Sequence, residues 1–151
     1  MPTELEFKYE EMFPNFGLTG SAALYEGVPV TWDQVDPTNS KTIFQVGQSW
    51  YVYLHWRTTG WLNCAMAGDW QIRVFLEQMG VGEYQLMEQP ITEPFKCTDP
   101  GIYHKLVPFS QEVPEGIYKL VVALTLKGPS EAPLPIAAMA EGPMIQFYET
   151  P

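Results

Sequence analysis

The chain has few cysteines and no long apolar run. Cys64 and Cys97 are the two cysteines among 151 residues, too few for a disulfide scaffold and without the spacing of a zinc site. Free thiols are expected, and a single disulfide is the alternative. No window approaches the roughly 18 uninterrupted apolar residues of a membrane-spanning helix, and the N-terminus is acidic where a secretory signal would be basic. A soluble, cytoplasmic protein is therefore expected.

Positive charge is also scarce. Lysine and arginine total 8 against 18 aspartates and glutamates, so the formal net charge is −10. This charge repels phosphate backbones and anionic membrane surfaces, and neither nucleic acid nor membrane is an expected partner. Hydrophobic residues at 46% and charged residues at 17% argue against a disordered chain. The 12 glycines and 14 prolines, with 14% aromatics, are typical of short strands joined by tight turns.

Catalytic and cofactor motifs are missing from the sequence. It contains no P-loop, no Gly-x-Ser-x-Gly and no His-Glu-x-x-His, and the pair Gly80 and Gly82 lacks the third glycine of a dinucleotide loop. His55 and His104 are the two histidines. A His/Ser or His/Cys dyad assembled in space is one interpretation of them, and a structural role is the preferred one. A non-catalytic protein without cofactor or metal is expected.

From Lys41 onward the hydrophobic period is two, as in β-strands. Trp50 to Trp56, Trp70 to Leu76 and Tyr118 to Leu126 each alternate apolar with other residues, and Gly80 and Gly82 supply the positive φ angles of a hairpin. The last two strands are expected at 136–139 and 144–149. About seven strands without interleaved helices predict an all-β, antiparallel sandwich over residues 41–151. Its core would contain Trp50, Trp56 and Trp70.

Residues 1–40 are predicted to form an acidic N-terminal extension that packs on, or links to, this domain. They hold seven acidic residues against Lys8 alone. Residues 5–13 fit a strand as well as they fit a helix, because both periods are present before Pro14. Pro37 and Asn39 indicate a loop that follows.

Two local features carry a resemblance to a known group of domains. Trp70 lies on the third strand of the domain, and the run from Val113 through Gly116 to Tyr118 resembles a tyrosine corner. On these residues and the strand rhythm, about 110 residues resemble a bacterial immunoglobulin-like or fibronectin-type-III-like domain. The resemblance implies an immunoglobulin-like sandwich in which the Tyr118 hydroxyl bonds to upstream backbone. Neither cysteine lies on the strands that an antibody-type disulfide joins.

A row of residues lies opposite the predicted core face of the strand at 50–57. It consists of Tyr51, Tyr53, His55 and Arg57, a composition that is enriched at protein interfaces. Three explanations stay open: the N-terminal segment covers the row, another chain binds it, or a glycan stacks on it or on nearby Trp61.

The function expected from the sequence is a non-catalytic protein-interaction or assembly module. Its partner would be another protein or a second copy of the chain, giving a homo-oligomer. A carbohydrate-binding module with exposed Tyr and Trp side chains is the first alternative, and a phage or virion structural protein is a more distant one.

Overall fold

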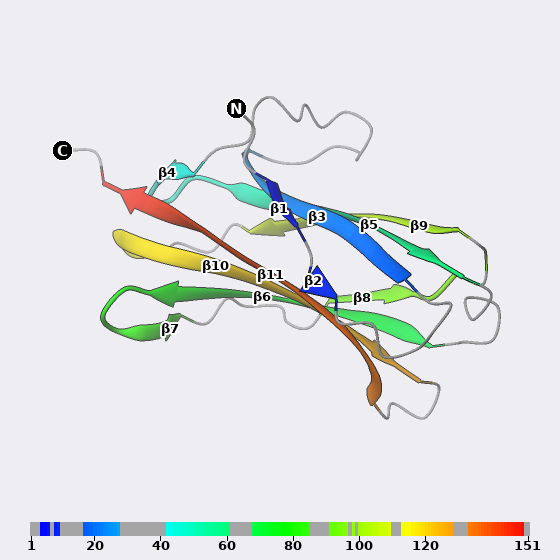
Figure 1. The fold of residues 1–151 in the computed structure, drawn as a ribbon. Coiled ribbons are helices and arrows are strands. Elements are labelled where there is room, and N and C mark those ends of the chain that lie inside the picture. Colours follow the sequence, from blue (N-terminus) through cyan, green and yellow to red (C-terminus); the bar gives the residue numbers. More distant parts are fainter. Residues whose placement is uncertain are drawn as a thin grey trace.

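The computed structural model describes residues 4–6, 8–9, 17–27, 42–60, 68–84, 91–96, 98, 100–109, 113–128 and 133–149. All regular structure in these ranges is β-strand, which confirms the all-β prediction. Within them no helix is long and apolar enough to cross a membrane. The strands form two sheets, called sheet A and sheet B, that lie one above the other (Figure 1).

Sheet A has four strands in the order β1-β3-β5-β9, all antiparallel. They are β1 (Glu4–Glu6), β3 (Gly17–Glu26), β5 (Trp50–Thr59) and β9 (Gly101–Phe109). Strands β3 and β5 pair from Gly17 opposite Thr59 to Glu26 opposite Trp50. Gly20 permits their close approach, because a Cβ at this position would lie 2.6 Å from the Trp56 Cα.

Sheet B has seven strands, of which five follow the order β2-β11-β10-β6-β7. These are β2 (Lys8–Tyr9), β11 (Pro133–Tyr148), β10 (Gly116–Lys127), β6 (Asp69–Gln78) and β7 (Gly82–Tyr84). In addition, β8 (Ile91–Pro94) pairs with β6, and β4 (Ile43–Gln45) pairs with β11. The β4–β11 pair is parallel, so sheet B is mixed and the purely antiparallel prediction is wrong at this point.

The division of residues 41–151 into strands also differs from the prediction. Within residues 41–151 the described chain has eight strands, β4 to β11, where about seven were expected, and the two strands expected at 136–139 and 144–149 are one strand, β11. Three strands that the hydrophobic period did not define, β1, β2 and β8, have only two to four residues, too few for an alternating pattern to be recognised. The pairing register between β10 and β11 shifts at the β10 residues Lys119 and Val121. Such an irregularity interrupts the alternation along β11, so the sequence pattern indicated two strands instead of one.

The two sheets pack on each other through one apolar core. Trp56 of sheet A meets Trp70 of sheet B with ring centroids 6.1 Å apart, and Trp50 meets Phe147 at 5.7 Å. All three predicted core tryptophans are fully buried. Alternate residues of β5, β6 and β10 supply a large part of the core, and β3, β4, β9 and β11 add to it. This alternation places the intervening residues on the outer faces of the two sheets.

The segment before residue 41 takes part in both sheets. Its residues 4–6 and 8–9 are strands, and β3 supplies Leu18, Ala22 and Leu24 to the core. The loop expected around Pro37 and Asn39 lies outside the described residues. The division of the chain at residue 40 stays a prediction.

Two turns follow the expected chemistry. Gly80 and Gly82 have positive φ angles of 81° and 120° and join β6 to β7. At the start of β10 the buried Tyr118 hydroxyl donates a 2.7 Å hydrogen bond to the Pro114 carbonyl, the contact that a tyrosine corner makes. A Cβ at Gly116 would lie 3.1 Å from Gln78 Nε2 and in ordinary van der Waals contact with the Tyr118 ring, at 3.4 Å.

Candidate functional site

The predicted row on β5 changes from buried to exposed along the strand. Tyr51 is buried, Tyr53 and His55 are half-buried, and Arg57 is exposed. The Tyr51 ring stacks on Tyr25 with centroids 5.3 Å apart, and burial raises the pKa of the Tyr51 phenol. Of the remaining sequence candidates, Trp61 and both cysteines lie outside the described residues.

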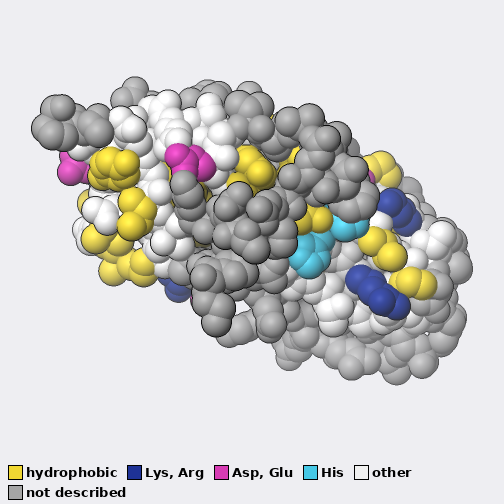
Figure 2. Space-filling model, turned by 90° about the horizontal axis from the view of Figure 1, so that it is seen from above, with side chains coloured by type: hydrophobic (Ala, Val, Ile, Leu, Met, Phe, Trp, Pro, Cys, Tyr) yellow, Lys and Arg dark blue, Asp and Glu magenta, His cyan; other side chains and the backbone are white. Residues whose placement is uncertain are grey.

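Polar side chains on the outer face of sheet A bond to one another. Ser21, His55 and His104 are direct neighbours across β3, β5 and β9. The Ser21 hydroxyl lies 2.6 Å from His55 Nε2, and the Tyr53 hydroxyl lies 2.6 Å from His104 Nδ1. Figure 2 shows the two histidines together on this face. We call these four residues the histidine network.

The histidine network brings together a hydroxyl and an imidazole, the first requirement of a nucleophile and its base. Ser21 is only 5% exposed, however, and within the described residues no carboxylate hydrogen-bonds to His55 to complete a triad. The pKa of His104 is lowered by burial first, then by the nearby charges of His55 and Lys96. The geometry is that of hydrogen bonds between neighbouring strands that stabilise sheet A, in which each half-buried polar group has a partner.

The outer face of sheet B has a different character, because it exposes apolar side chains. Of the eight large hydrophobic residues that are exposed in the described ranges, Ile102 alone lies on sheet A. The others lie on sheet B or on the β6–β7 turn: Ile43, Met79, Val81, Ile117, Met139, Met144 and Tyr148. Large contiguous apolar patches on a protein surface are typical of interaction sites.

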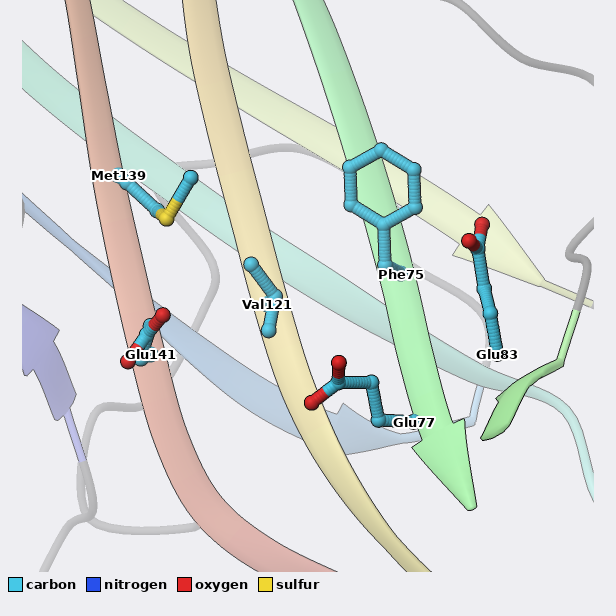
Figure 3. A pocket seen from close by; sticks show the side chains of 6 residues that line it. All are labelled: Phe75, Glu77, Glu83, Val121, Met139 and Glu141. Carbon is cyan, nitrogen blue, oxygen red and sulfur yellow. The ribbon is translucent and has the colours of Figure 1, made fainter. Parts of the chain in front are cut away.

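A shallow groove of about 280 Å³ crosses this face. Its lining comes from four neighbouring strands (Figure 3): Phe75 and Glu77 from β6, Glu83 from β7, Val121 from β10, and Met139 and Glu141 from β11. The register sets Phe75, Val121 and Glu141 side by side in one row. The next row sets Glu83 directly opposite Glu77. The groove therefore has an apolar floor and carboxylates along its sides, and we call it the acidic groove.

The sequence contained a signal for the acidic groove. Phe75 and Val121 are apolar residues at outward positions of their strands, where polar residues are the rule. The alternation along each strand indicates that Phe75 and Val121 point outward. Their position next to Glu83 and Glu141 depends on the register between strands that are distant in the sequence. Within the described residues no group of three or more His, Cys, Asp or Glu is arranged to hold a metal ion.

Comparison with protein-family models and with curated protein sequences finds no match for this chain.

Proposed function

We propose that this chain is a non-catalytic protein-interaction module on an immunoglobulin-like β-sandwich, and that the outer face of sheet B is its recognition surface. The single observation that carries the proposal is the distribution of exposed apolar residues, seven of eight on sheet B or its β6–β7 turn. Burying such residues against a partner removes apolar surface from water, which is the main favourable contribution in protein association.

The immunoglobulin-like part of the proposal is supported by two features of the core. Two sheets enclose tryptophans from both sides, with Trp56 against Trp70, and the Tyr118 hydroxyl bonds to the Pro114 carbonyl upstream of its own strand. Both are features of immunoglobulin-like sandwiches.

Sheet A supports an interaction role less well than sheet B. Glycan stacking needs open aromatic faces, whereas Tyr51 is buried against Tyr25 and Tyr53 stacks on His104 with an angle of 8° between the rings. These tyrosines therefore do not form an open row along β5. The carbohydrate-binding alternative rests on weaker geometry than the interaction module.

The test is a selection of binding peptides from a random display library on the full chain. Each selected peptide is then measured against M139S/M144S, which removes two exposed apolar side chains from sheet B, and against I102S. Ile102 is 49% exposed on sheet A, close to the 45% of Met139, and is the matched control. We expect affinity to fall at least tenfold for M139S/M144S and to stay within twofold for I102S.

Circular dichroism and the melting temperature check that each variant is folded. If the selection yields no binders, or if I102S weakens binding as much as M139S/M144S does, the outer face of sheet B is not the recognition surface.

A further inference from the structure

Resting on the proposed function, we propose that the acidic groove binds a lysine or arginine side chain carried by an extended, basic segment of a partner protein. The groove combines an apolar floor with carboxylates on both sides. Lysine and arginine combine an apolar stem with a cationic head, so the two sets of groups are complementary.

The floor of the groove suits the stem of such a side chain. Phe75 and Val121 are half-buried neighbours on β6 and β10, and Met139 is exposed on β11. A methylene chain lying across them would remove apolar surface from water on both partners. A cation held over the Phe75 ring would add a cation–π attraction.

The pairing of Glu77 with Glu83 favours a cationic ligand. The two residues are directly opposite each other in the antiparallel β6–β7 pair, where Cβ atoms lie about 5 Å apart and like charges destabilise a sheet. Lys119 of β10 lies directly opposite Glu77 on its other side, but its ammonium pairs with Glu141. In the described part of the chain neither Glu77 nor Glu83 forms an ion pair. A cation held beside both carboxylates would replace this repulsion with attraction.

Glu141 does not lie next to Glu77 and Glu83, and it makes the site longer across the sheet. It lies on β11, two strands away from β6, which corresponds to about 10 Å at the usual strand spacing. Lys119 of β10 lies 3.4 Å from Glu141, an ion pair with both side chains partly exposed and therefore easily exchanged. Carboxylates spread in this way match successive cations on an extended peptide better than one small ion.

The net charge of the chain favours a basic partner over a second copy of the chain. The chain carries a net charge of −10, so a second copy bringing the same acidic groove to this face would be repelled, whereas a basic segment would be attracted from a distance. The partner is therefore a basic segment of a different protein.

The experiment uses labelled nine-residue peptides in which leucine alternates with lysine, with serine or with glutamate. Their binding to the full chain is followed by fluorescence anisotropy at low and high salt. We expect the lysine peptide to bind at least tenfold more tightly than the serine peptide and to lose that advantage at high salt. The glutamate peptide should not bind.

Two charge variants localise the binding. E77Q/E83Q removes the opposed carboxylates, and E115Q/E149Q changes the net charge equally at two exposed positions that do not line the groove. We expect E77Q/E83Q to lower the affinity for the lysine peptide at least tenfold and E115Q/E149Q to lower it less than twofold. Equal weakening by both variants would reduce the effect to net charge and overturn the proposal.

The outcomes separate this inference from the proposed function. If the serine peptide binds as tightly as the lysine peptide and M139S/M144S abolishes both, the basic partner is wrong while the recognition surface stands. If M139S/M144S leaves the binding of every peptide unchanged, both the basic partner and the recognition surface are wrong.

Discussion

The outer faces of sheets A and B both mix polar with apolar side chains, but they use them in opposite ways. On sheet A, Ser21 bonds to His55 and Tyr53 bonds to His104, so the polar groups stabilise their own sheet. On sheet B, Glu77 faces Glu83, and Met139 and Met144 are exposed to solvent. Side chains that satisfy one another support the fold, whereas apolar and like-charged side chains left at a surface are available to a partner.

Both outer faces lie on sheets that share one core. Trp56→Ala tests this, and it is the change from which we expect the largest loss of stability. Trp56 contacts Trp70 of the other sheet and stacks on Tyr103 at 4.9 Å. Its loss should lower the free energy of unfolding by about 3–5 kcal/mol. The measurement is urea denaturation followed by circular dichroism. A loss below about 1 kcal/mol would show that the sheets do not depend on each other.

The second prediction compares one tyrosine from each outer face. Tyr53→Phe on sheet A removes the hydroxyl next to His104 and should cost about 1 kcal/mol of stability. Tyr148→Phe on sheet B removes a hydroxyl from an exposed side chain and should change stability by less than about 0.5 kcal/mol. Both are measured by urea denaturation. Equal losses would remove the distinction between the faces.

The third prediction concerns pH and the histidine network. Burial, then the charges of His55 and Lys96, hold the pKa of His104 below its ordinary value. The unfolded chain therefore binds the proton first as pH falls, and stability should decrease from about pH 6.5 downward until the folded histidine also protonates.

Urea denaturation at pH 7.5 and pH 5.5 measures this effect. His104→Gln should reduce the difference in stability between the two pH values, although it also removes the bond to Tyr53 and lowers stability at pH 7.5. The same pH dependence in the wild type and in His104→Gln would show that His104 is not its source.

The smallest expected effect is a gain in stability on sheet B. Glu83→Gln removes one charge from the pair that faces across β6 and β7, and it should stabilise the fold by a few tenths of a kcal/mol. Glu115→Gln, at an exposed position outside the groove, serves as the control for net charge. Thermal unfolding of the two variants in low salt measures the difference. A loss of stability in Glu83→Gln would mean that the pair is not repulsive.

The sequence predicted those features that depend on local alternation. Trp50, Trp56 and Trp70 belong to runs of period two long enough to define an inner face, and all three are buried. The hydrogen bond from Tyr118 to Pro114 follows from a motif of six residues and needs no knowledge of distant pairings.

Features that depend on pairing between distant segments were not predictable in the same way. The alternation along β5 left open whether Tyr51 is covered; Tyr25 of β3 stacks on its ring and Tyr51 is buried. The parallel β4–β11 pair joins segments about a hundred residues apart. The acidic groove needs the register of four strands at once, and outward apolar residues on single strands gave only part of that information.

The most direct test of the difference between the two faces is the rate at which Met139 and Met144 are oxidised by hydrogen peroxide, with and without the lysine–leucine peptide. Both thioethers are exposed on sheet B, at 45% and 44%, and oxidation of methionine follows its exposure. Digestion and mass spectrometry give the rate for each residue. The account predicts that the peptide slows oxidation of both several-fold. Unchanged rates at a saturating peptide concentration would contradict the assignment of recognition to the outer face of sheet B.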